Sequence, residues 1–148
     1  MKSKTASVLI KLTALILVFS FSIPCVVSAT TSESVQPYAS KYLTSYNTYI
    51  CDLGSGNFQI WFDVMGTGTM DEIGTLSIEL YEVNSDGSLT WMKTFLHENY
   101  SSMLITDDYY HCSYVSFKGS SSKTYKAYVC IWAGKNGSGD TRYMWATE

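Results

Sequence analysis

Along residues 41–148, apolar side chains recur mostly at every second position, and clusters of Gly, Ser, Asn and Asp separate the alternating runs. Alternation with a period of two is typical of β-strands that bury one face, and no stretch carries a helical stripe of useful length. The pattern predicts seven strands, at about residues 42–52, 58–65, 75–83, 89–96, 109–117, 125–133 and 141–146. Residues 97–106 fit neither pattern and are expected to be irregular, with room for one helical turn.

Glycine-rich segments are expected to end several of these strands. Gly66–Thr69 would close the second strand, Asp86-Gly87 would form a hairpin turn, and residues 134–140 would turn the chain before the last strand. These glycines are assigned to turns that need a positive φ. A phosphate cradle would need a helix after the loop, and here strands follow.

Seven short antiparallel strands favour two sheets packed face to face. The expected fold class is an all-β, two-sheet antiparallel β-sandwich, preceded by a signal-peptide helix. The segment Thr124–Ala133, in which Tyr, Ala, Val, Ile and Ala alternate from Tyr125 onward, resembles the end of a fibronectin type III-like or immunoglobulin-like sandwich. The resemblance implies that the Tyr125 hydroxyl closes a corner of the sandwich and that the third and sixth strands are neighbours.

The first 29 residues are interpreted as a secretory signal peptide. Lysines near the start precede the apolar run Leu12–Phe21, and Val27-Ser28-Ala29 provides small residues before a cleavage site after Ala29. The alternative is an uncleaved membrane anchor, but the apolar stretch is shorter than the ~20 residues that span a bilayer. Lipid attachment at Cys25 is rejected because Pro24, and not a small residue, stands directly before that cysteine.

The remaining chain divides into a flexible tether at residues 30–40 and one β-sandwich domain at residues 41–148. A length of 148 residues excludes a barrel of eight βα units, and 46% hydrophobic residues exclude a disordered chain. The formal net charge of −3 argues against nucleic acid as a partner. We expect a secreted, extracellular protein that meets the membrane only through its signal peptide during export.

Three cysteines follow the leader: Cys51, Cys112 and Cys130. An odd number is unusual for a secreted domain, so at most one disulfide can form and three pairings are open. The other interpretation is three half-buried thiols. No spacing resembles a zinc site.

Two further segments carry a second resemblance, which covers most of the exported chain. Residues 66–74 and 132–142 are similar to segments of small secreted proteins of Gram-positive, often anaerobic, bacteria, an uncharacterised family. The resemblance implies an exported domain and transfers no catalytic residue.

Candidates for catalysis and metal binding are few. His97 lies beside Glu98, and His111 follows Asp107-Asp108, but no nucleophile stands in a recognisable motif. Calcium needs six to eight oxygen ligands, and the short acidic pairs do not supply them in alternating positions. We expect no catalytic residue, no cofactor and no metal.

Aromatic residues are the most informative feature, because twelve Tyr and four Trp exceed what one sandwich core needs. If the apolar positions of the third and sixth strands face inward, their alternate positions face outward and lie on neighbouring strands. This predicts a ligand-contact surface with Glu79 and Arg142 at its polar edge, and its aromatic residues are Tyr81, Tyr128 and Trp132.

The sequence therefore predicts a non-catalytic binding module whose ligand is an extracellular glycan or protein. Cross-strand aromatic pairs that only stabilise the sheets are the structural alternative. A secreted effector, such as a small antibacterial protein, and a small extracellular hydrolase are the competing functions. The sequence leaves the oligomeric state open.

Overall fold

The computed structural model describes residues 40–148, which form eight strands and one short 3-10 helix. The elements are β1 (Leu43–Asp52), β2 (Asn57–Met70), β3 (Glu72–Val83), β4 (Leu89–Leu96), η1 (Ser101–Met103), β5 (Leu104–Ile105), β6 (Asp108–Lys118), β7 (Thr124–Lys135) and β8 (Ser138–Thr147). The expected leader, its helix and most of the tether lie outside the described residues. Within the described residues, no helix is long and apolar enough to cross a membrane.

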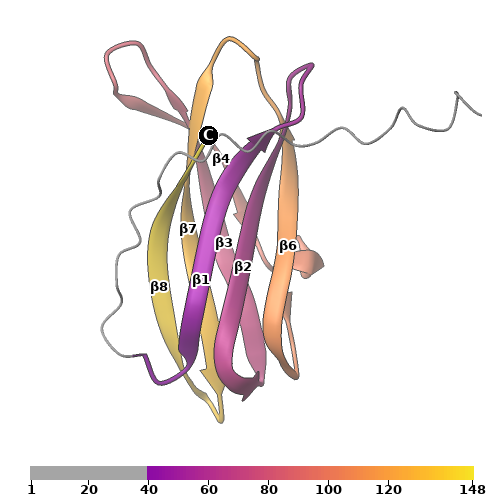
Figure 1. The fold of residues 1–148 in the computed structure, drawn as a ribbon. Helices are drawn as coiled ribbons and strands as arrows, with labels where there is room; N and C mark the ends of the chain where they lie inside the picture. Colours follow the sequence, from indigo (N-terminus) through magenta and orange to yellow (C-terminus); the bar gives the residue numbers. More distant parts are fainter. Residues whose placement is uncertain (1–39) are drawn as a thin grey trace, which may run out of the picture.

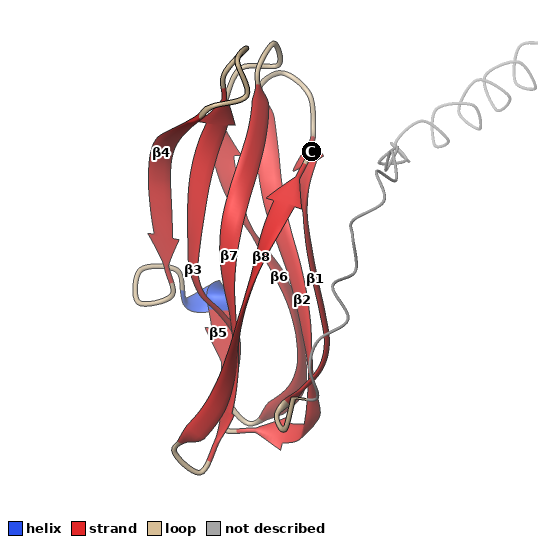
Figure 2. Ribbon diagram, turned by 90° about the vertical axis from the view of Figure 1, so that its left-hand side faces the viewer, coloured by secondary structure: helices blue, strands red, loops and turns tan. Residues whose placement is uncertain are grey.

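Residues 40–148 form two antiparallel sheets, so the predicted β-sandwich is confirmed (Figures 1 and 2). One sheet has the order β1-β2-β6, and the other has the order β4-β3-β7-β8 with the two-residue β5 beside β3. Strands β3 and β7 are paired, which is the neighbour relation that the fibronectin-like arrangement implies. Strands β1 and β8 contact each other along one side of the sandwich.

The core lies between the sheets and is built from the alternating positions that the sequence indicates. On β7, side chains at every second position from Tyr125 to Ala133 are almost fully buried. Ile78 and Leu80 of β3 and Phe58 and Phe62 of β2 meet them in the same cluster. Burial of these apolar surfaces is the main force that holds the sheets together.

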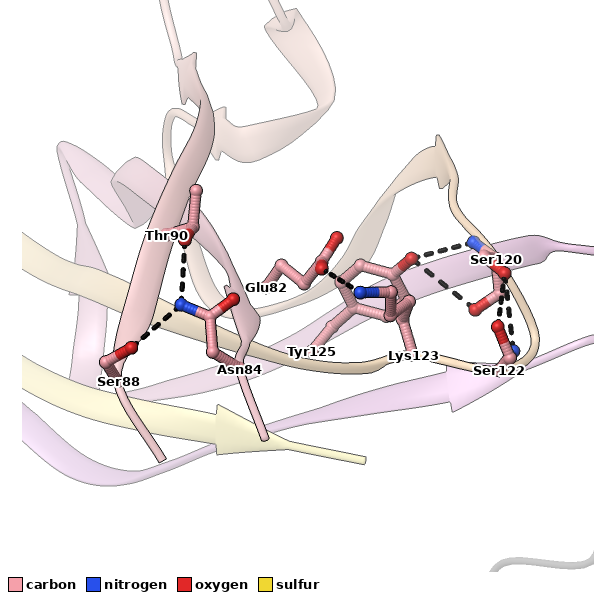
Figure 3. A network of polar contacts seen from close by, with 8 residues as sticks. All are labelled: Glu82, Asn84, Ser88, Thr90, Ser120, Ser122, Lys123 and Tyr125. Atoms are coloured by element: carbon pink, nitrogen blue, oxygen red, sulfur yellow. Dashed lines mark hydrogen bonds and ion pairs between the residues drawn. The ribbon is translucent and has the colours of Figure 1, made fainter. Parts of the chain in front are cut away.

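Tyr125 joins β7 to the loop before it (Figure 3). Its hydroxyl accepts a hydrogen bond of 2.7 Å from the backbone N–H of Ser120. A Cβ atom at Gly119 would lie 2.6 Å from the Tyr125 hydroxyl, so glycine is needed where the loop passes this ring. Lys123 connects the same loop to the C-terminal end of β3, because its ammonium group lies 2.7 Å from the Glu82 carboxylate.

The predicted end of the second strand is wrong. Strand β2 continues through Gly66–Thr69 to Met70, and neither Gly66 nor Gly68 has a positive φ. A Cβ atom at Gly66 would lie 2.9 Å from the side chain of Met70, which folds back over it. Gly66 thus permits close packing within a strand, where we predicted a turn.

The last hairpin is tighter than predicted. Strand β7 extends to Lys135 and β8 begins at Ser138, so only Asn136 and Gly137 connect them. Both residues have positive φ, at 54° and 73°, as a two-residue hairpin turn requires. The two flanking glycines, Gly134 and Gly139, lie in the strands themselves.

Candidate binding surface

Five aromatic side chains lie together on the outward face of the five-stranded sheet, and we call this surface the aromatic face. Pairing across the sheet places Trp91 opposite Tyr81, and Trp145 opposite Tyr128. Tyr143 lies on the same face of β8, two residues before Trp145. The members of the aromatic face are Tyr81, Trp91, Tyr128, Tyr143 and Trp145.

Ring contacts connect four of these residues without a gap. The ring of Tyr128 lies with its centroid 5.5 Å from that of Tyr143 and 4.9 Å from that of Trp145. The Trp145 ring in turn lies 5.7 Å from Tyr81. Such distances are typical of favourable aromatic pairs, so the rings support one another as a platform.

Much of this platform is accessible to solvent. The exposed fraction is 60% for Trp91, 59% for Tyr143 and 45% for Trp145, whereas Tyr81 and Tyr128 are half-buried. Removing aromatic surface from water is favourable, and these rings nevertheless remain in contact with solvent. The sequence prediction of more rings than the interior holds agrees with this exposure.

Trp132, a predicted member of the surface, lies further along β7 from Tyr128. A Cβ atom at Gly134 or Gly139 would lie 2.6 Å or less from the Trp132 ring, so both glycines make room for it. The indole N–H donates to the carboxylate of Glu72, 3.2 Å away. Trp132 therefore faces the same side of the sheet as Tyr128, but its contacts are with Glu72 and the two glycines near the end of the sheet.

Of the two predicted polar residues, Glu79 lies on the aromatic face and Arg142 does not. Glu79 pairs with Tyr128, and the Tyr81 hydroxyl donates a hydrogen bond to its carboxylate. That hydrogen bond raises the pKa of Tyr81 above its ordinary value. Arg142 pairs with the inward-facing Ile131, so the alternation of β8 places it on the opposite face from Trp145.

Lys126 adds a positive charge to the same surface, because it pairs with Tyr81 on one side and Thr147 on the other. The aromatic face therefore carries one carboxylate, one ammonium group and tyrosine hydroxyls around its rings. These are hydrogen-bonding groups that can orient a polar ligand.

Cys130 lies on the outward face of β7, opposite Tyr143, but it is buried at 7% exposure because its neighbours cover it. Burial raises the pKa of its thiol, and hydrogen bonds to Tyr143 and Ser77 act in the opposite direction. Among the described residues, Cys51, Cys112 and Cys130 form no disulfide. Two of the three thiols are buried and that of Cys112 is exposed, whereas the sequence interpretation expected half-buried thiols.

A second row of aromatic residues, which the sequence analysis did not single out, crosses the outward face of the three-stranded sheet. Trp61 of β2 lies between Tyr49 of β1 and Tyr114 of β6, with ring centroids 6.3 Å and 4.7 Å away. Each ring pairs directly with the next across the strands, and the Trp61 indole donates to Gln59. We call this row the rear ladder. The sequence signal that could have predicted it is the alternation of the first, second and fifth predicted strands, which places these three rings on the outward side.

The histidines have different surroundings. His97 lies 3.4 Å from the carboxylate of Glu98 at the end of β4. His111 is buried, and its Nε2 atom lies 2.8 Å from the carbonyl oxygen of Ser102, which attaches η1 to β6. In residues 40–148, no cluster of three or more His, Cys, Asp or Glu side chains could hold a metal ion.

Comparison with known proteins found no matching family model, no matching curated protein and no matching solved structure.

Proposed function

We propose that this protein is an exported, non-catalytic β-sandwich that binds a carbohydrate through its aromatic face. The observation that carries the proposal is the contact of Tyr81, Trp145, Tyr128 and Tyr143 in one exposed platform. The flat faces of aromatic rings are electron-rich, and they attract the C–H groups on the face of a sugar ring.

Polar groups beside the rings support the same ligand class. Glu79 and Lys126 lie on the same face as Tyr81, and the tyrosine hydroxyls both donate and accept hydrogen bonds. A sugar has apolar ring faces and hydroxyl groups at its rim, so platform and rim groups match the two parts of the ligand. Export rests on the leader predicted from the sequence.

The extent of the surface favours a glycan over a folded protein partner. At about 200 Å² per aromatic side chain, the five rings expose no more than about 500 Å². A stable protein interface takes about 800 Å² from each partner. A carbohydrate chain needs only the rings and their polar neighbours.

The proposal is tested with the purified chain and insoluble cellulose, chitin and bacterial peptidoglycan as probes. Trp145→Ala removes the ring that connects Tyr81 to Tyr128, and we expect about a tenfold loss of affinity for the retained polysaccharide, or about 1.4 kcal/mol. Trp61→Ala in the rear ladder is the matched control, because it removes a half-buried tryptophan from the other sheet.

Thermal unfolding of both variants shows whether the fold survives. Retention on none of the three polysaccharides, or an equal loss of retention by Trp145→Ala and Trp61→Ala, contradicts a carbohydrate site on the aromatic face. Binding of a soluble protein that depends on Trp145 would assign the same face to a protein partner instead.

A further inference from the structure

A groove with a volume of about 710 Å³ opens on the side of the sandwich away from the β1–β8 contact. It lies between β4 and β6, which are the edge strands of the two sheets. Phe58, Leu80, Met92 and Phe117 contribute apolar surface to it. The groove therefore offers apolar surface to a ligand.

Two lysines line this groove from opposite strands, Lys93 on β4 and Lys118 on β6. No acidic side chain is among the lining residues of this otherwise acidic protein. The Lys93 ammonium lies 2.8 Å from the Tyr100 hydroxyl and 4.6 Å from the Phe95 ring centroid, and neither group neutralises it. Lys123, by contrast, is paired with Glu82. The groove therefore presents positive charge to a ligand.

The free edge of β6 borders the same groove. One hydrogen bond shows which backbone groups of β6 point toward β2 and which point to the free edge. The Gly119 N–H donates to the Gly56 carbonyl, next to the first pair of the β2–β6 ladder. Odd-numbered residues of β6 therefore bond to β2, and even-numbered residues turn their N–H and C=O groups outward.

We propose that this groove binds an extended acidic peptide, which adds a strand to the free edge of β6. Ser116 and Lys118 would supply backbone hydrogen bonds, and Lys93 and Lys118 would pair with carboxylates of the peptide. Addition of a strand to an exposed sheet edge is an established mode of peptide recognition.

Two other occupants fit the groove less well. A second copy of the chain, paired through the same edge, would bring its own Lys93 and Lys118 to the positive groove. An aliphatic carboxylate would satisfy the lysines and the apolar lining, but it would leave the backbone groups of Ser116 and Lys118 unused. The peptide uses the charge, the apolar surface and the edge together.

The test uses a fluorescein-labelled seven-residue peptide of alternating Glu and Val, with fluorescence anisotropy as the readout. We expect Lys93→Glu/Lys118→Glu to weaken binding at least about tenfold, because each lost charge-assisted contact is worth more than a neutral one. A peptide with Lys in place of Glu should not bind. Decanoate at millimolar concentration should not displace the acidic peptide.

Backbone pairing is tested at Ser116. Ser116→Pro removes an N–H that points away from the β2 ladder, so it should spare the fold but weaken binding about tenfold. Ser116→Ala keeps the N–H and should bind like the wild type. N-methylation of alternate peptide residues should also abolish binding, and this readout does not depend on how Ser116→Pro folds.

Three results would overturn the proposal: equal binding of the Glu and Lys peptides, displacement by decanoate, or unchanged affinity of the N-methylated peptide. Concentration-dependent self-association that Lys93→Glu/Lys118→Glu abolishes would assign the edge to a second copy. The proposal is independent of the carbohydrate site, because Trp145→Ala changes the outward face of the five-stranded sheet, away from the groove, and should leave peptide affinity unchanged.

Discussion

Tyr125→Phe removes one oxygen atom from the corner of the sandwich and leaves the ring in place. The ring is 1% exposed and lies with its centroid 5.0 Å from that of Phe58 and 5.2 Å from that of Phe117, both in edge-on contact. Phenylalanine can keep these contacts, so the change isolates the hydroxyl. The backbone N–H of Ser120 loses the acceptor of its 2.7 Å hydrogen bond, and the Ser120 carbonyl oxygen loses a longer contact, 3.5 Å, with the same hydroxyl.

The expected cost follows from that lost hydrogen bond. A buried hydrogen bond contributes about 1 kcal/mol net, and a donor left without a partner at a part-buried site costs about 1–3 kcal/mol. We therefore expect Tyr125→Phe to lower the free energy of unfolding by about 1.5–2 kcal/mol. For a domain of this size, that corresponds to a fall in Tm of roughly 6–12 °C.

Urea denaturation followed by tryptophan fluorescence measures the change, with an unchanged m value expected because the unfolded surface is the same. Tyr100→Phe is the matched control, since its exposed hydroxyl only accepts a hydrogen bond from Lys93 and its loss should cost no more than about 0.5 kcal/mol. If Tyr125→Phe is no more destabilising than Tyr100→Phe, the hydroxyl does not hold the corner.

Two further predictions concern the backbone and pH. Gly74→Ala should lower the free energy of unfolding by at least about 3 kcal/mol in urea denaturation, because φ is 144° and a Cβ atom would lie 2.2 Å from the Met103 carbonyl oxygen. The control is Gly87→Ala, which has a positive φ but open space around it and should cost only about 1–2 kcal/mol. Equal losses in the two variants would contradict the close contact at Gly74. Hydrogen bonds from Ser40 and from the backbone of Tyr42 and Lys41 hold the pKa of Asp140 below its ordinary value, so its stabilisation is present above that ordinary pKa and is lost as pH falls through the lowered one. The urea midpoint should therefore fall less between pH 5 and pH 2 in Asp140→Asn than in the wild type, and an equal fall would show that the carboxylate does not anchor the start of β1.

Local pattern was sufficient to predict most of the strands. Strand β4 has the predicted bounds, β1 begins one residue later than predicted, and β3, β6 and β7 extend the predicted ranges by three residues or fewer at either end. Each has period-two alternation between a buried and an open side, which the sequence displays directly. The main error was to end the second strand at Gly66. Glycine occurs both in turns and where another group packs closely against the backbone, and only the packing of Met70 shows that the second role applies here.

The candidate surface was predicted in part. Tyr81, Tyr128 and Glu79 lie together because β3 pairs with β7, and that pairing followed from the fibronectin-like resemblance. The rings that complete the surface come from β4 and β8, whose register no local pattern fixes. Trp91, Tyr143 and Trp145 were therefore missed.

By itself, the sequence determined that this chain folds into strands, which faces of the central strands are buried, and that aromatic residues are in excess of the core. Alternation and composition are local properties, and they carry that information without a fold. Only the tertiary structure decided that Trp145 connects Tyr81 to Tyr128, that Arg142 lies on the opposite face, and that the free edge of β6 borders a groove with two lysines. These features depend on strand register and on the distance between sheet edges, which are set by contacts between residues far apart in the chain.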